Sequence, residues 1–146
     1  MIFSGPSNAS GNDRVTRRHL GRAVFTNSST PLDAWHLYPS GGTVEDLDRI
    51  SAQDVVVAHV NDAPPGIPRD EQINNVRALP MESGVIDLSA FMQKLDQMRY
   101  DGPVTLAPFS TRLNDMASTD PLRAVRTAAE SMDALWKAAS LNSPTS

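Results

Sequence analysis

Residues 55–64 read Val-Val-Val-Ala-His-Val-Asn-Asp-Ala-Pro, and this stretch decides the fold. The β-branched run over residues 55–60 is typical of a buried strand. The proline-rich segment over residues 61–68 precludes regular structure, because proline fixes its own backbone angle and donates no backbone hydrogen bond. The sequence therefore predicts a central strand that opens directly into a loop.

Helical and strand patterns alternate on both sides of this strand. Upstream, residues 32–38 form a short apolar stretch, expected as the first strand, which ends at a Pro-Ser-Gly-Gly turn signal. Thr43 with Asp46 is close to a capping box and predicts a short helix. Downstream, residues 103–109 are expected to form a third strand.

Two further helices are predicted from their caps and their apolar periodicity. Asp87 is expected to cap the first helix, and Asp120 the second, in which Pro121 takes the favoured first position. The apolar face of the first helix comprises Leu88, Phe91, Met92, Leu95 and Met98. The apolar face of the second comprises Leu122, Val125, Ala129, Met132 and Trp136.

The resulting order of strand, helix, strand, helix, strand, helix predicts an α/β fold with parallel strands and right-handed crossovers. We expect residues 1–30 to be a flexible, disordered segment, because Ser, Asn, Gly, Thr and Arg dominate there without an apolar period. Residues 31–140 are expected to form the folded part, and residues 141–146 a frayed tail.

Composition narrows the classes of function. The 146 residues carry a formal net charge of −4, which argues against nucleic acid as the main partner, because phosphate binding needs a clustered basic surface. The lack of cysteine excludes disulfide scaffolds, thiolate metal sites and cysteine nucleophiles. No run approaches the ~18 apolar residues of a membrane span. We therefore expect a cytoplasmic protein with no membrane or nucleic-acid partner.

Carboxylate and imidazole side chains, which can bind metals or take part in catalysis, lie where the first two strands end. Asp33 and His36 lie at the end of the first strand, and His59 and Asp62 at the end of the second. Sites are built at the carboxyl ends of parallel strands, and imidazole with carboxylate suits Mn, Co, Zn or Fe better than Ca. The structural alternatives are a plain loop imidazole for His36 and a packing role for its neighbour Trp35.

The other candidates have alternatives of the same kind. Asp33 and Asp62 are of the type that forms caps and turns. His59 lies within an apolar run, where a neutral core histidine bonded to backbone also fits. Arg69 and Arg77 lie in a long polar loop, where arginines are usually solvated but, over a strand-end site, can hold an anion.

These stretches resemble a known family. Residues 32–42 resemble the sixth-strand motif of the sugar phosphate isomerase/epimerase family, and residues 57–64 resemble its seventh strand and following loop. The next loop, the helix start and the eighth strand are matched by residues 69–71, 77–80, 84–88, 100–104 and 108–110. The match covers residues 31–139 and implies the C-terminal (βα)3 part of a xylose-isomerase-like TIM barrel: three parallel strands, six to eight, with flanking helices.

The resemblance also implies a function. In this family a divalent metal (Mn, Co, Mg or Zn) polarises a sugar's carbonyl and hydroxyl, while carboxylates move protons between adjacent carbons. By motif position, Asp33 and His59 are the implied metal ligands. His36, Arg69 and Asp62 are the implied contacts to a small sugar or polyol substrate.

Two departures from the family pattern bear on activity. Ala107 stands immediately before Pro-Phe, where the family pattern has a metal-binding glutamate. The match begins at the sixth strand, and a complete barrel is typically ~250 residues, so we expect this chain to lack strands one to five and the other glutamate. We expect a truncated, catalytically impaired sugar isomerase or epimerase. The alternatives are a non-catalytic remnant or binding module, and a half-barrel that pairs with a complementing chain or forms a homo-oligomer.

Overall fold

The computed structural model describes residues 30–107 and 109–141. Three strands, β1 (Thr30–Asp33), β2 (Val55–His59) and β3 (Val104–Thr105), form one parallel sheet in the order β1-β2-β3. This order confirms the parallel α/β arrangement expected from the sequence. The predicted flexible segment and the predicted tail lie outside the described residues, apart from residues 30 and 141.

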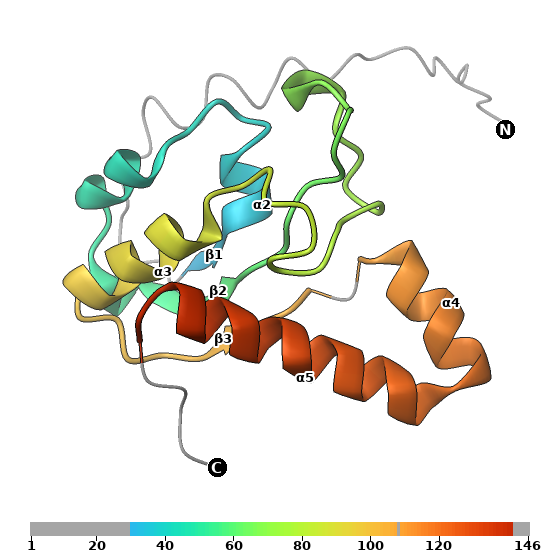
Figure 1. Ribbon diagram of the computed structural model, residues 1–146. Coiled ribbons are helices and arrows are strands. Elements are labelled where there is room, and N and C mark those ends of the chain that lie inside the picture. Colours follow the sequence, from blue (N-terminus) through green and yellow to red (C-terminus); the bar gives the residue numbers. More distant parts are fainter. Residues whose placement is uncertain (1–29, 108, 142–146) are drawn as a thin grey trace, which may run out of the picture.

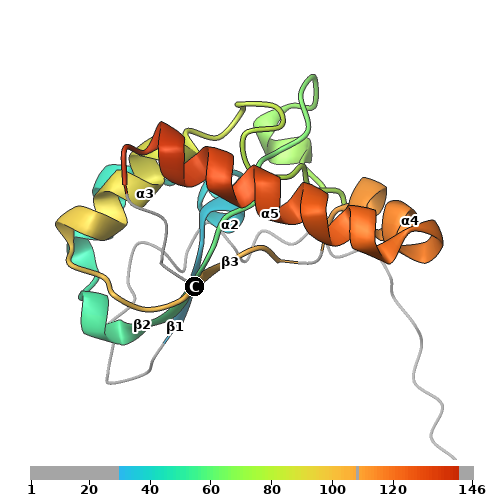
Figure 2. The same cartoon turned by 60° about the horizontal axis from the view of Figure 1, so that its bottom comes forward.

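Two long helices cover one side of the sheet. α3 (Leu88–Gln97) and α5 (Pro121–Ala138) lie on the same side of the strands, and α4 (Thr111–Thr119) precedes α5 at one end of the molecule (Figure 1, Figure 2). The connections hold α2 (Ala34–Leu37) and the 3-10 helices η1 (Val44–Arg49), η2 (Ala52–Asp54) and η3 (Arg69–Glu71). None of the described helices combines the length and apolar character that a membrane span needs. The buried core consists of Ala34, Leu47, Ala58, Val60, Leu88, Phe91, Met92, Leu95, Leu135 and Ala139.

Local sequence signals explain where the helices begin. Asp87 Oδ1 accepts a hydrogen bond from the Ala90 N–H at 2.9 Å, and Asp120 Oδ1 accepts one from the Arg123 N–H at 3.0 Å. Each cap satisfies one of the backbone donors that a helix start leaves unpaired. Both starts confirm the predictions. The short helix expected near residue 43 is also present, as the 3-10 helix η1.

Two strands end earlier than the sequence predicts. The first ends at Asp33, because Asp33 Oδ1 accepts the Trp35 N–H at 2.9 Å and starts α2 there. The third ends at Thr105, and beyond it the side chain of Asn61 takes the place of a neighbouring strand. Asn61 Oδ1 accepts the Ala107 N–H at 2.9 Å, and Asn61 Nδ2 donates to the Ala107 carbonyl at 3.3 Å.

The predicted apolar face of the last helix is wrong in its first half. Leu122 and Val125 are 71% and 67% exposed, whereas Ala124 on the same turn is buried. This half of α5 extends past the sheet and packs against α4, an element that the sequence analysis does not predict (Figure 1). In the second half, Met132 and Trp136 do pack against the core, as predicted.

Candidate functional site

The candidate site lies along the edge where the three parallel strands end. Asp33 pairs in register with His59, and His59 pairs with Thr105, so the three side chains share one face of the sheet. His59 Nδ1 and Thr105 Oγ1 lie 3.0 Å apart. The fold therefore brings Asp33 and His59, the two implied metal ligands, to neighbouring positions on one rim.

A buried ion pair joins this rim to the long loop between β2 and α3. Asp33 Oδ2 accepts a hydrogen bond from Arg77 Nη1 at 2.8 Å, and Arg77 Nη2 lies 3.1 Å from His36 Nε2. The side chain of Arg77 is 0% exposed and that of Asp33 is 12% exposed. Since Arg77 can only donate, the nitrogen of His36 that faces it must accept.

The protonation of His36 follows from these surroundings. Burial lowers the pKa of His36; the charge of Asp33 opposes this shift, and Arg77 and His59 add to it. The side chain is 60% exposed, so the imidazole combines a buried contact to Arg77 with an open face. His36 is therefore a neutral hydrogen-bonding group at the edge of the site.

Trp35 lies against the ion pair. Its ring stands edge-on to the His36 imidazole, with centroids 5.2 Å apart, and the Arg77 guanidinium lies 4.5 Å from its centroid. The indole N–H is buried and has no hydrogen-bond partner among the described residues. The packing role expected from the sequence therefore accounts for the ring but not for this donor, because buried polar groups normally have a partner.

Asp62 lies beneath the loop rather than at its surface. Its carboxylate accepts hydrogen bonds from four backbone N–H groups, at 2.6–3.3 Å, those of Ala63, Ser83, Gly84 and Ile86. Its backbone pairs with Ala78 in both directions at 3.0 Å. Because both carboxylate oxygens are bonded to backbone amides, Asp62 holds the loop that carries Arg77. The turn-forming alternative describes this geometry better than a contact to substrate.

Arg69 lies on the same loop but at the surface. Its guanidinium donates to the carbonyls of Tyr38 and Gly42, at 2.8 Å for Gly42, and lies 4.7 Å from the centre of the Tyr38 ring. These contacts join the loop to the turn that follows α2. The exposed guanidinium stays within reach of solvent, and its contact to substrate stays a prediction.

Whether these residues fit the implied divalent metal is decided by the donor set. Asp33 has one oxygen bonded to the Trp35 N–H and the other to a guanidinium, whose positive charge opposes a second cation. Ala107 is buried and offers a methyl group. Within residues 30–107 and 109–141, no three His, Cys, Asp or Glu side chains are grouped as a metal ion needs. The residues present do not fit a resident divalent metal.

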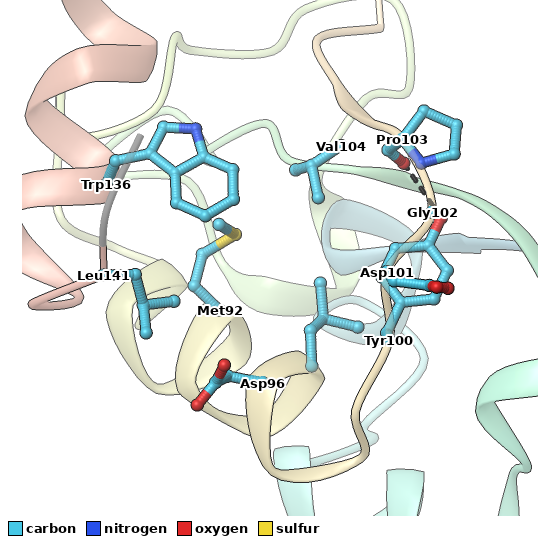
Figure 3. Close-up of a pocket in the computed structure, with 10 residues that line it drawn as sticks. Met92, Asp96, Tyr100, Asp101, Gly102, Pro103, Val104, Trp136 and Leu141 are labelled. Carbon is cyan, nitrogen blue, oxygen red and sulfur yellow. Dashed lines mark hydrogen bonds between the residues drawn. The ribbon is translucent and has the colours of Figure 1, made fainter. Parts of the chain in front are cut away.

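A separate cavity of about 410 Å³ lies at the opposite end of the sheet, before β3 begins (Figure 3). Met92, Val104 and Trp136 are among the side chains that line it. Next to them, the Tyr100 hydroxyl donates to the Pro103 carbonyl at 2.9 Å. In barrels of parallel strands, residues at the amino ends serve stability rather than chemistry. The cavity is therefore not part of the candidate site.

Comparison with known protein families shows which family this chain belongs to. The sequence profile of xylose isomerase-like TIM barrels matches residues 27–135. The chain belongs to the xylose isomerase-like TIM barrel family. The resemblance that the strand-end motifs carry is thereby confirmed, as is the fold it implies. A comparison with curated proteins found no match.

Three solved structures share the fold of this chain. The IolI protein, solved with a bound zinc atom, superposes with a TM-score of 0.65 at 21% identity over 76% of this chain. A xylose isomerase domain protein from Alicyclobacillus acidocaldarius gives 0.60 at 25% identity over 78%, and one from Salmonella typhimurium gives 0.62 at 22% over 72%. The chain spans 38–39% of the length of these three relatives. The chain therefore has the fold of part of a xylose isomerase-like TIM barrel.

Arg77 is the residue whose place in the site the sequence analysis does not predict. The sequence predicts a solvated arginine or one that holds an anion at the site, and the structure instead pairs Arg77 with the Asp33 carboxylate. A signal is present in the sequence: Arg77 is followed closely by Leu79 and Pro80, both of which are buried. This signal is weak, because the burial of sequence neighbours does not fix the burial of the arginine; an arginine that is fully buried is expected to be paired.

Proposed function

We propose that this chain contributes to the sugar-binding rim of a xylose isomerase-like protein, and that it binds a sugar or polyol without isomerising it. The main support is that the rim is neutral and rich in hydrogen-bonding groups. Asp33 is neutralised by Arg77, and the neutral His36 presents an open face beside them. Hydroxyl groups both donate and accept, so they suit a neutral imidazole such as that of His36 without needing a net charge.

Trp35 places a buried donor beside this rim, which a ligand oxygen reaches only if the packing around the ring opens. Its buried indole N–H has no acceptor among the described residues, and Trp35 contacts both His36 and Arg77. An indole N–H only donates, so the group that satisfies it must be an acceptor such as a hydroxyl or carbonyl oxygen. A metal ion cannot fill that role.

Metal-dependent proton transfer next to a carbonyl is the activity that the family resemblance implies. It needs carboxylates to hold the metal and to carry the proton. Of the implied ligands, this chain has Asp33 and His59, with Asp33 paired to Arg77 and with Ala107 at a glutamate position. Isomerase or epimerase activity is what the family resemblance implies, and we propose that this activity is impaired in this chain.

The test uses the two tryptophans as internal reporters. Amide and indole NMR spectra of the full chain are recorded while D-xylose, D-fructose or D-fructose 6-phosphate is added to millimolar excess. We expect the indole N–H signal of Trp35 to shift on binding, while that of Trp136, in the cavity at the other end of the sheet, stays in place. His36→Ala should weaken the binding severalfold, and Asp101→Ala, beside the cavity, should not. A Trp35 signal unmoved by every sugar would exclude the proposal.

Arg69 is tested in the same titration. If its guanidinium contacts substrate, Arg69→Gln should weaken binding of the sugar phosphate more than binding of the neutral sugars, because the guanidinium pairs with phosphate. If Arg69→Gln leaves the affinity for the sugar phosphate and the affinity for the neutral sugars unchanged, Arg69 does not contact the ligand.

A second candidate function is complementation of another chain. In the described part of the chain, β1 and β3 each pair on one side, and the chain spans 38–39% of its solved relatives. Exposed strand edges favour pairing with a further strand. The test mixes the chain with a fragment that carries the first five strands of a relative and measures the mass by light scattering. A stable one-to-one complex supports this candidate; separate elution contradicts it.

A further inference from the structure

Arg77 has surroundings that fix its guanidinium in place. Its guanidinium lies between two aromatic rings, 4.5 Å from the centre of Trp35 and 4.8 Å from the centre of Phe109. The side chain is completely buried. A buried charge is costly unless it is paired and hydrogen-bonded, so this position has to be accounted for by its partners.

The loop supplies several of those partners. Arg77 Nε donates to the Asn74 carbonyl at 3.0 Å, and Nη2 donates to Asn74 Oδ1. The Arg77 backbone N–H donates to the Phe109 carbonyl at 2.9 Å, which fixes the residue against the segment after β3. The guanidinium is therefore held on its faces and its edges, and it is not free to move toward a ligand.

Its remaining partners are a carboxylate oxygen and an imidazole nitrogen, which are donor types that divalent metals also bind. Asp33 Oδ2 and His36 Nε2 lie 3.8 Å apart, and both face the guanidinium, at 2.8 and 3.1 Å. A divalent metal bound by the same two atoms at about 2.1 Å would hold them about 3.4 Å apart. The amino groups of Arg77 thus lie where this pair of atoms would otherwise hold a cation.

We infer that Arg77 is the resident cation of this rim. Its guanidinium neutralises Asp33 in the place of a divalent metal, so Asp33 and His36 bind Arg77 and do not bind metal in this chain. The inference deepens the proposed function, on which it rests for the kind of ligand: a rim whose charge is balanced internally selects uncharged hydroxyl compounds. The preference for such ligands follows from the ion pair and not from a bound metal.

The test measures binding of Zn²⁺ by calorimetry to the full chain and to Arg77→Met. Methionine keeps an extended side chain between the two rings and removes the charge. We expect Arg77→Met to bind Zn²⁺ at least tenfold more tightly than the parent chain, and this gain to disappear when Asp33→Asn or His36→Gln is added. Arg69→Met, an exposed arginine on the same loop, is the matched control and should bind Zn²⁺ as the parent chain does.

Three results would overturn the inference. The first is tight, stoichiometric Zn²⁺ binding by the parent chain that Asp33→Asn abolishes. The second is a folded Arg77→Met variant that binds no better than the parent. The third needs no variant: in the parent chain, the imidazole NMR signals of His36 should not move when one equivalent of Zn²⁺ is added, and movement contradicts the inference even if Arg77→Met fails to fold. These outcomes are independent of the sugar titration, so the two proposals can fail separately.

Discussion

Replacing Asp62 by asparagine should destabilise the fold although it removes no atom from the core. Asparagine keeps one carbonyl oxygen, which can still accept from Ala63 and Ile86. At the other oxygen it places an amide NH2 group against the N–H groups of Ser83 and Gly84, which are donors too. Two hydrogen bonds to a charged acceptor are lost, each contributing about 1.5–3 kcal/mol.

The expected loss in the free energy of unfolding is therefore about 3–6 kcal/mol, a large part of the 5–15 kcal/mol that is roughly typical of a domain. Urea unfolding followed by circular dichroism measures it. Asp87→Asn is the matched control, because Asp87 accepts a single helix-capping bond, and asparagine caps about as well as aspartate. A loss below about 1 kcal/mol for Asp62→Asn, similar to the control, would refute the assignment of Asp62 as the anchor of the loop.

Three further outcomes follow from other parts of the molecule. Burial lowers the pKa of His36, so below about pH 6.5 the unfolded chain binds more protons at this residue than the folded chain does. The contribution of His36 to the free energy of unfolding should therefore be complete above that pH and decrease below it. His36→Gln should lose this part of the pH dependence in thermal melts. Gly102→Ala should cost about 1–2 kcal/mol in urea unfolding, because its Cβ would lie 2.5 Å from the Tyr100 hydroxyl. Light scattering after size exclusion should give dimers or larger species. Changing both Leu122 and Val125 to serine should shift these species toward monomer, because both side chains are exposed on α5. An unchanged mass would exclude this face of α5 from the contact between copies of the chain.

The elements fixed by neighbouring residues could be predicted from the sequence. The strand over residues 55–59 follows from a β-branched run, and α3 follows from the Asp87 cap and an apolar period that is buried at Leu88, Phe91, Met92 and Leu95. The strand-end location of Asp33 and His59 follows from the parallel order of the strands. In each case the physical signal spans a few residues, so no distant contact has to be known.

The parts that could not be predicted depend on distant partners. Arg77 meets Asp33 across 44 residues of sequence, and no local pattern specifies which carboxylate a loop arginine will find. The apolar stripe of α5 is likewise present in the sequence, but the burial that it predicts is wrong at Leu122, which is exposed. Periodicity identifies the apolar face of a helix, but whether another element covers that face depends on where the helix extends relative to the sheet.

The Asp62 carboxylate has a consequence for the dynamics of the chain. The loop over residues 60–87 holds little regular structure, and amide hydrogens in such loops usually exchange quickly with solvent. Here the amide hydrogens of Ala63, Ser83, Gly84 and Ile86 are bonded to a completely buried carboxylate, so they can exchange only when Asp62 is exposed. These loop amides should therefore exchange as slowly as those of β2, and the opening that releases them should also free Arg77 from Asp33.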